Sequence, residues 1–375
     1  MNVPKLRFKE FNDDWNYESL SKYVDRITTK NKNNESNLVL TISAQYGLVD
    51  QTEFFNRNVS SSNLTGYYLL NKGDFAYNKS YSNGYPWGAV KRLNRYNQGV
   101  VSSLYICFKP NNKISSNYLE QYFETDKWYQ QISEVSVEGA RNHGLLNIAV
   151  NDFFNTKHYI PQFKEQEKIS KFLSLLDKKI ELQSKKIEDL KLFKLCIMKS
   201  IFDSSKVSIN LKIKDISLIE KGKQINGDQL LEFGDYYMLN GGINPSGYLN
   251  VYNRNENTIT ISEGGNSCGY VSFNKNKFWC GGHCYSVSPI NINNEYLYQL
   301  LKYNERKIMD LRVGSGLPNI QKKDLENLPI KIHNNSDQEN ISILLSKYDS
   351  KIDLEIIKLN ILNKIKKGLI QNLFV

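Results

Sequence analysis

A loop in the first half of the chain combines amide, hydroxyl, aromatic and basic side chains. It runs NKSYSNGYPWGAVKRLNRYNQ from Asn78. Asn can pair bidentately with adenine and Arg or Lys with guanine, while further Lys and backbone amides hold phosphates. Alternatively, Tyr85 and Trp87 are tucked into a core and the rest is an ordinary polar surface loop. The candidate nucleic-acid contacts are Asn78, Lys79, Ser80, Tyr81, Asn83, Tyr85, Trp87, Lys91, Arg92 and Arg95.

The second half offers analogous polar side chains in its own loops. These are Asn240, Asn244, Asn266, Ser267 and His283. Two further sets lie beside a repeated segment described below, where we favour contacts to phosphates or to another subunit over base reading. They are Arg141, Asn142, His143, Arg312 and Ser315.

Cysteine and histidine lie close together in the second half, as Cys280-Gly-Gly-His283-Cys284 with Cys268 upstream. Thiolates and imidazole are good zinc ligands. The spacing differs from a C-x₂-C knuckle and strand-like sequence encloses it, so we favour a structural or DNA-facing role and expect no metal. Five scattered cysteines suit a reducing compartment better than a disulfide framework.

Common catalytic motifs are missing from the sequence. There is no G-x-x-x-x-G-K-[ST] phosphate loop. An adenine methyltransferase is expected to carry an N/D-P-P-Y/F tetrad, and the nearest text, from Asn244 to Gly247, lacks the aromatic residue. The glycines of GGNSCG at 264 do not fit G-x-G-x-x-G. We therefore expect no catalytic residues and no cofactor site in this chain.

Composition gives weaker guidance. The formal charge of +10 over 375 residues hints at a polyanionic partner, but half of that excess lies in two helical stretches. The first residues lack the apolar core of a signal peptide, and no run approaches the ~18 apolar residues of a membrane span. We expect a cytoplasmic protein.

The segment 162–202 contains no Gly or Pro and predicts one helix of roughly 60 Å. Its apolar residues alternate at spacings of four and three, the period of a coiled coil, with polar interruptions at Gln183 and Lys194. The same seam recurs 172 residues downstream, interrupted at Glu355 and Lys366. The seam residues are Ile169, Leu173, Leu176, Ile180, Ile187, Leu190, Ile197, Ile201, Ile341, Leu345, Tyr348, Ile352, Leu359, Leu362, Leu369 and Leu373.

Identities as well as periodicity recur at this offset. Gln166, Glu167 and Ile169, for example, return as Gln338, Glu339 and Ile341. Independent helices would share a period but not identities, so a unit has been duplicated. For the second helix, Ser336 and Glu339 also predict a capping box.

Short apolar or alternating runs broken by Gly and Asn fill the regions outside the helices and predict strands. The two regions share a layout but few identities; GAV at Gly88 aligns with GYV at Gly269. We predict an α+β protein with two β-rich mixed domains separated by two long antiparallel helices that form an intramolecular coiled coil with approximate two-fold symmetry. The predicted segments are a first domain at 1–158, a helix at 159–204, a second domain at 205–333 and a helix at 334–375. Pairing of the helices between chains is the alternative.

Three features together resemble the specificity subunit of a type I restriction-modification system. They are RFKEF followed by Trp15 near the start, the G-x-x-NI-x-x-x-D loop before each helix (144–152 and 316–324), and EQEKISKFLSLLDKKI with its second copy. The resemblance covers essentially the whole chain and is strongest in the repeated segments. The two copies differ just before the long helices: the first has Thr156, Lys157 and His158 where the second has Leu328, Pro329 and Ile330.

The resemblance implies two target-recognition domains that each read half of a bipartite, asymmetric DNA sequence, with the helices as a ruler for the gap. It also implies a non-catalytic subunit. Modification subunits would transfer methyl groups from S-adenosylmethionine to adenine, and restriction subunits would translocate and cleave with ATP and Mg²⁺, in defence against phage. Two alternatives remain: a scaffold whose twin domains bind proteins rather than DNA, and an enzyme of unknown type.

Overall fold

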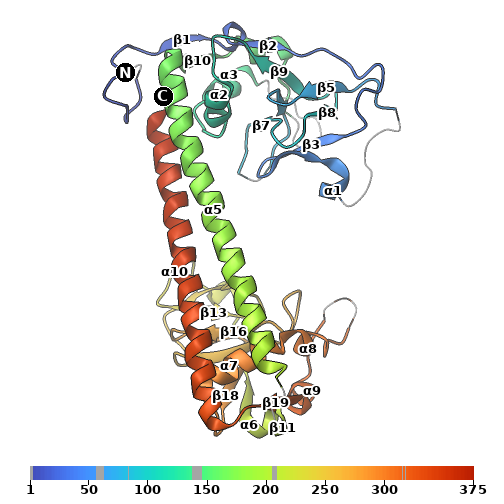
Figure 1. Cartoon of the computed structure of the whole chain (residues 1–375), viewed down its shortest axis with the longest axis vertical. Coiled ribbons are helices and arrows are strands. Elements are labelled where there is room, and N and C mark those ends of the chain that lie inside the picture. Colours follow the sequence, from blue (N-terminus) through green and yellow to red (C-terminus); the bar gives the residue numbers. More distant parts are fainter. Residues whose placement is uncertain are drawn as a thin grey trace. The chain divides into compact units, whose positions relative to one another are not determined.

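The computed structural model describes residues 3–55, 63–82, 84–136, 146–204, 209–314, 316 and 318–375. Its contacts divide the chain into two compact units. The first unit is Met1–Leu182 with Leu359–Val375, and the second unit is Gln183–Lys358. Each unit therefore contains one globular part and a portion of each long helix (Figure 1).

The two long helices are α5, Phe163–Phe202, and α10, Asn335–Leu373. They confirm the predicted pair of helices, and they are antiparallel. In the second unit Gln183 contacts Glu355 and Lys194 contacts Asp349, so residue numbers rise along one helix as they fall along the other. Every residue of the predicted seam is buried or half-buried, while the residues around it are largely exposed.

The first unit is built on a four-stranded antiparallel sheet of order β2-β9-β6-β7. These strands are β2 Val24–Arg26, β9 Ile106–Pro110, β6 Phe75–Asn78 and β7 Ala89–Arg92. Three two-stranded sheets accompany it: β1 Asn16–Ser19 with β10 Lys157–Ile160, β3 Leu40–Ser43 with β4 Gly47–Asp50, and β5 Tyr68–Asn71 with β8 Gln98–Val101. The short helices are η1 Leu20–Lys22, α1 Gln51–Phe55, α2 Ser116–Phe123, α3 Tyr129–Val135 and α4 Val150–Asn155.

The second unit repeats this framework. Its four-stranded sheet has the order β12-β18-β15-β16, from β12 Ser217–Lys221, β18 Cys284–Pro289, β15 Thr258–Ser262 and β16 Val271–Asn274. Beside it lie β11 Ile209–Lys212 with β19 Pro329–Ile332, and the three-stranded sheet of β14 Gly247–Leu249, β13 Tyr236–Leu239 and β17 Trp279–Cys280. The short helices are α6 Ile213–Ile216, η2 Gly227–Gln229, α7 Asn294–Tyr303, α8 Glu305–Met309 and α9 Lys322–Asn327.

Gly88 and Gly269 occupy equivalent positions in the two four-stranded sheets. Each precedes the fourth strand of its sheet with a positive φ, +77° and +90°. A Cβ would come within 2.2 Å of the Asn78 carbonyl oxygen in the first case and 2.8 Å of the Met309 Cα in the second. Only glycine fits such a position. The predicted shared layout of the two β-rich parts is therefore confirmed.

Phe202 and Phe374 occupy the same position of the two repeats, and each packs into the core of its unit. In the first unit Phe374 lies against Tyr118 and Tyr122 in a core rich in aromatic rings. In the second unit Phe202 packs against Tyr296 in a core dominated by Ile and Leu. The end of each long helix thus completes a globular core.

Helix caps follow the sequence in α2 but not in α10. The Ser115 side chain accepts from the Tyr118 N–H, and serine is among the residues preferred at a helix N-cap. At α10 the prediction of Ser336 as cap is wrong, because the Asn334 side chain accepts from the Asp337 N–H at 2.9 Å. An Asn is as good a cap as Ser, and here it lies two residues earlier. No helix in the described part of the chain is long and apolar enough to cross a membrane.

Candidate nucleic-acid interface

The loop that follows β6 in the first unit is tied to the segment before α4. The Asn78 side chain accepts from the Ser80 N–H at 3.1 Å and forms a local turn. The Lys79 carbonyl accepts from the Leu146 N–H at 2.9 Å, and its ammonium donates to the Ile148 carbonyl at 3.1 Å. Burial lowers the pKa of Lys79. Tyr81 is 61% exposed, and Arg95 is also exposed.

Other candidates in this loop contact the protein itself. Trp87 packs against the main core and Tyr85 against a smaller one. Lys91 is buried and pairs with Glu124 at 2.6 Å. Arg92 pairs with Glu120 at 2.5 Å and donates to Asn117. These four side chains are engaged with α2 and the cores, whereas Tyr81 and Arg95 face solvent.

The ion pairs of Lys91 and Arg92 line a charged cavity of about 460 Å³ in the first unit. It lies between β7, α2 and the long helices, and Lys91 and Arg92 line it together with Glu120, Glu124 and Asp177. Bases on the strand are thus neutralised by acids on the helices. The cavity holds an internal ion-pair network, which sequence reasoning could not separate from a surface loop of the same composition.

Polar residues from separate loops come together in the second unit. The Asn240 side chain accepts from the His283 N–H at 3.0 Å. The Gly264 and Asn319 backbones form a bridge, and the Gly265 N–H donates to the Pro318 carbonyl. We call four loops together the four-loop surface: 240–244, 263–267, 281–283, and the loop between α8 and α9, of which 312–314 and 318–319 are included. Of its candidates, Asn244, Asn266, His283 and Arg312 are exposed and Ser267 is half-buried.

Glu263 is a residue that sequence reasoning missed. It is 6% exposed and lies under this surface. One carboxylate oxygen accepts from Lys221 at 2.7 Å and from the Tyr285 hydroxyl at 2.9 Å. The other is 4.0 Å from His283 Nδ1 and has no hydrogen-bond partner among the described residues. Burial and this carboxylate raise the pKa of Tyr285. The feature of the sequence that could have pointed to Glu263 is its place in SEGG, an acidic residue next to two glycines at the end of a strand.

The cysteines beside this surface are packed in the interior. Cys268, Cys280 and Cys284 are buried. The Cys268 thiol donates to the Glu263 carbonyl at 3.0 Å, and the Cys280 thiol to the Cys284 carbonyl at 3.5 Å. Within the described ranges no group of three His, Cys, Asp or Glu side chains is arranged to hold a metal ion. The candidates Asn83, Arg141, Asn142, His143 and Ser315 lie outside the described residues.

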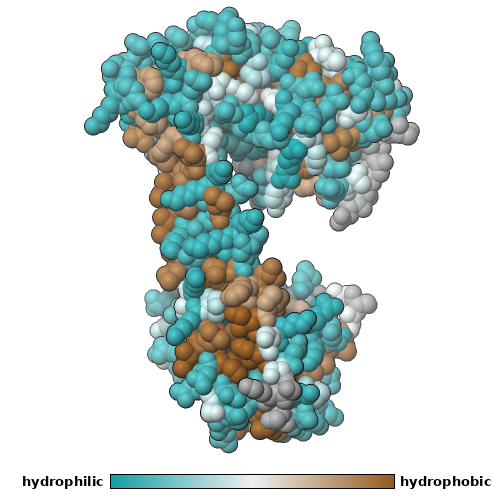
Figure 2. Space-filling view, in the orientation of Figure 1, coloured by the Kyte–Doolittle hydropathy of each residue, from teal (hydrophilic) through white to brown (hydrophobic). Residues whose placement is uncertain are grey.

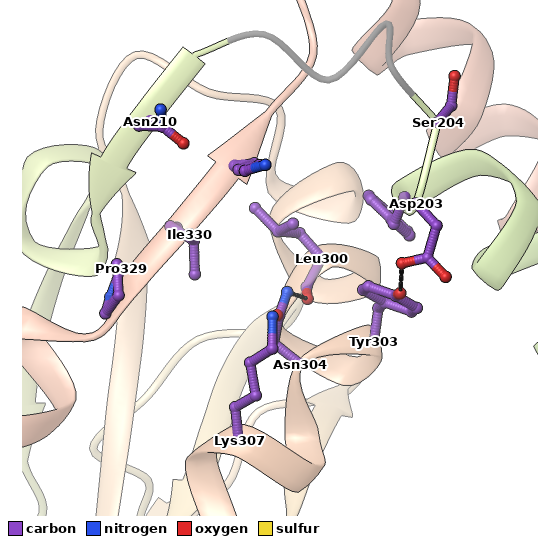
Figure 3. Close-up of a pocket in the computed structure, with 11 residues that line it drawn as sticks. Asp203, Ser204, Asn210, Leu300, Tyr303, Asn304, Lys307, Pro329 and Ile330 are labelled. Atoms are coloured by element: carbon purple, nitrogen blue, oxygen red, sulfur yellow. Dashed lines mark hydrogen bonds between the residues drawn. The ribbon is translucent and has the colours of Figure 1, made fainter.

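A second cavity, of about 370 Å³, lies at the end of α5 (Figure 3). The Tyr303 hydroxyl donates to the Asp203 carboxylate, and the Asn304 side chain donates to the Leu300 carbonyl at 2.9 Å. Burial, followed by this bond to Asp203, raises the pKa of Tyr303 to about 12. The bond between Tyr303 and Asp203 joins α7 to the end of α5, whereas the Asn304 bond closes the end of α7 itself.

Comparisons with known proteins agree with this architecture. Residues 208–367 match the family model described as type I restriction modification DNA specificity domain. A protein named as type I specificity subunit S.MpnORF638P of Mycoplasma pneumoniae is 36% identical over 139 residues, which cover 36% of this chain and 37% of that protein. Its counterpart S.MgeORF438P of Mycoplasma genitalium is 30% identical over 139 residues, 36% of each chain. These matches span little more than a third of the relatives' own length.

Two solved structures resemble the whole chain. The crystal structure of a type I restriction-modification S subunit from M. genitalium has a TM-score of 0.65 at 19% identity and covers 100% of this chain and 99% of its own. A chain from a study of assembly and conformational transition in a type I system has a TM-score of 0.58 at 14% identity, covering 98% and 99%. At these identities the likeness concerns the fold.

The structure is therefore a pair of long helices with two sheet-based units that share one framework and differ in their loops. Residues 208–367 resemble the DNA specificity domain of type I restriction-modification systems, and the two relatives that match about a third of the chain are named as type I specificity subunits.

Proposed function

We propose that this chain is the DNA-reading subunit of a type I restriction-modification complex and that it recognises a bipartite, asymmetric target. One observation carries the proposal: two sheets with the same strand order present dissimilar loops. A duplicated framework with different loops is what reading two unlike half-sites requires, because the framework holds each surface while the loops choose the bases. The four-loop surface would read one half-site, and the loop after β6 the other.

Chemistry would come from partner subunits. The chain would supply recognition, modification subunits would methylate adenine with S-adenosylmethionine, and restriction subunits would use ATP and Mg²⁺ to translocate and cleave. The outer faces of the long helices favour protein partners. Figure 2 shows hydrophobic residues along these helices. Leu182 and its repeat equivalent Leu354 are 57% and 58% exposed, and Phe193 and Ile365 are 55% and 48% exposed.

Sequencing of methylated adenines tests the function directly. Cells with the chain should methylate one gapped sequence that cells lacking it leave unmodified. A methylome that does not change on deletion of the chain would contradict the proposal and favour the protein-binding scaffold. Binding of DNA by the assembled complex should also weaken with salt, the logarithm of the association constant falling by roughly 0.9 per logarithm of salt for each phosphate contacted.

The helices would fix the gap between the half-sites. Removing one heptad from both helices at the same level shortens the pair by roughly 10 Å. Because base pairs rise about 3.4 Å each, the methylated gap should shorten by about three base pairs. Removing a heptad from one helix alone mismatches the seam and serves as the control, which should fail to assemble. An unchanged gap after the matched deletion would refute the ruler.

A further inference from the structure

The same three-residue contact joins the long helices to the globular part in both units. In the second unit Lys194 Nζ lies 2.6 Å from Asp349 Oδ1, and Gln299 Nε2 lies 2.7 Å from Asp349 Oδ2. The lysine and aspartate belong to different long helices, whereas the glutamine belongs to α7. The aspartate therefore uses one oxygen for the helix pair and the other for the globular part.

The first unit forms this contact with repeat-equivalent residues. Lys366 Nζ lies 2.5 Å from Asp177 Oδ1, and Gln121 Nε2 lies 2.9 Å from Asp177 Oδ2. Both the lysine and the aspartate are displaced by 172 positions from their equivalents in the second unit. Gln121 and Gln299 end the similar segments SNYLEQ and NEYLYQ of α2 and α7. Recurrence at equivalent positions marks the contact as a feature of the duplicated unit.

The glutamine of each contact is buried, so removing the aspartate would leave its amide without a hydrogen-bond acceptor. Gln121 is 5% exposed and Gln299 is 1% exposed, and in the described structure neither amide oxygen has a hydrogen-bond partner. The bond to the aspartate therefore orients each amide, and a buried donor left without its acceptor is costly. Lys194 is 7% exposed; burial lowers its pKa, and Asp349 opposes that shift.

The glutamines stand on helices that support the candidate surfaces. α2 packs against β7 in the first unit, and α7 packs against β16 and β18 in the second. β18 begins directly after His283 of the four-loop surface. A displacement of one long helix along the other would move the aspartate away from its lysine, and with it the acceptor that orients the glutamine.

We propose that Asp177 and Asp349 are positioning residues that link the register of the helix pair to the placement of the globular part in each unit. This deepens the proposed function and rests on it where it concerns DNA: the register would set where each reading surface stands, and hence the gap that the complex accepts. The two aspartates contact no base in this scheme and act through the glutamines.

An exchange of charges separates the two roles of Asp349. The Lys194→Asp/Asp349→Lys variant that also carries Gln299→Lys keeps an ion pair between the helices but places two ammonium groups at the former link, so neither can accept a hydrogen bond from the other. Gln299→Glu in place of Gln299→Lys returns an acceptor and restores the link. Gln299→Leu removes the globular partner without touching the helix pair, and it covers the case in which the exchange does not fold. The same series at Lys366, Asp177 and Gln121 tests the first unit.

Two measurements test these variants: hydrogen exchange of the α7 amides, and the gap length of the DNA sequences that the complex methylates. In the exchanged and Gln299→Leu variants we expect amides of α7 to exchange about tenfold faster with those of α10 unchanged. We also expect methylation at more than one gap length, and Gln299→Glu should reverse both effects in the exchanged variant. Unchanged α7 exchange and a single gap in these variants would overturn the positioning role. If the wild-type complex methylates no gapped sequence, the proposed function fails, and hydrogen exchange alone decides this inference.

Discussion

Gln183 and Glu355 occupy the same position of the two repeats and bond to each other. Gln183 Nε2 donates to Glu355 Oε2 at 2.7 Å and to the Glu355 carbonyl at 2.9 Å. Lys186 and Lys358 each lie 3.0 Å from the other carboxylate oxygen. A polar pair in an apolar seam typically fixes register at some expense of stability. This pair of seam interruptions is therefore a mutual contact within one chain, whereas Lys194 and Lys366 each pair with an aspartate of the opposite helix.

The Glu355 carboxylate should make the second unit sensitive to acid. The bond from Gln183, followed by those from Lys186 and Lys358, lowers the pKa of Glu355 to about 2. Because the folded pKa lies below the unfolded value of about 4.3, this contribution is complete above that value and is lost as pH falls towards 2. Urea unfolding between pH 5 and 2 should show a shallower loss for Glu355→Gln than for wild type. Asp353→Asn, at an exposed ion pair with Lys275, is the control and should follow wild type.

Replacing Gln183 and Glu355 together by Leu should strengthen the helix pair. Apolar residues of similar volume in place of a buried polar pair are often neutral or stabilising, here by about 1 kcal/mol. Glu355→Leu alone leaves the Gln183 amide without its acceptor and should cost about 1–3 kcal/mol. Thermal unfolding distinguishes the two variants. Equal destabilisation in both would show that the pair contributes packing that Leu cannot supply.

His158 should weaken the first unit on mild acidification. The ring is 3% exposed and lies 2.8 Å from both the Tyr122 hydroxyl and the Thr156 hydroxyl. Burial lowers the pKa of His158 to about 3. The unfolded chain binds the proton at about pH 6.5, so stability is full above that pH and falls as pH drops towards 3. His158→Gln should flatten the fall in Tm between pH 7 and 5, and an equally steep fall in this variant and in wild type would contradict the prediction.

Exposed loop residues should alter the target sequence one half at a time. Tyr81→Ala in the first unit and Asn266→Ala in the second should each relax recognition at a different half-site, by about 1–3 kcal/mol for each base that is no longer read. Competition binding with singly substituted DNA duplexes measures this. Lys91→Met is the matched control: its ammonium pairs with Glu124, so it should lower stability and leave the sequence preference intact. The assignment fails if Tyr81→Ala and Asn266→Ala change both halves equally.

Charged residues on the outer helix faces should prevent assembly without unfolding the chain. Leu182 and Leu354 are more than half exposed, so Leu182→Asp with Leu354→Asp should change stability little. Desolvating the new carboxylates at a protein interface would be costly. Co-purification with the modification subunit should therefore be lost while DNA of any sequence is still bound non-specifically. Lys178→Asp, another exposed helix substitution, is the control for charge alone.

The sequence predicted the repeated elements much better than their contacts. α5 begins one residue after the start of the predicted stretch 162–202, because an uninterrupted seam and the absence of Gly and Pro determine a long helix locally. The equivalence of Gly88 and Gly269 was also visible, since a positive φ restricts the residue type. Such features depend on near neighbours in the chain.

Contacts between distant residues were not predictable from one sequence. Lys91 and Arg92 have the composition of a DNA-binding loop, but acids on α2 and at its C-cap, about thirty positions later, pair with them. Lys194 was visible as a break in the seam, whereas its partner Asp349 depends on how the helices pair. Glu263 lies in a turn that gives no sign of the tyrosine that bonds to it. In each case the sequence contains many possible polar partners, and only the folded structure determines which of them lies close enough to bond.

The burial of Phe374 in the first unit has a consequence during synthesis. The second unit is one continuous stretch, Gln183–Lys358, and can fold as soon as it leaves the ribosome. The first unit needs residues 359–375 as well, so its aromatic core stays incomplete while the second unit is made. At 5–20 residues per second this interval is on the order of ten seconds. The first unit is therefore synthesised first but completes its fold last. We expect chaperones to bind its exposed aromatic core residues on the nascent protein.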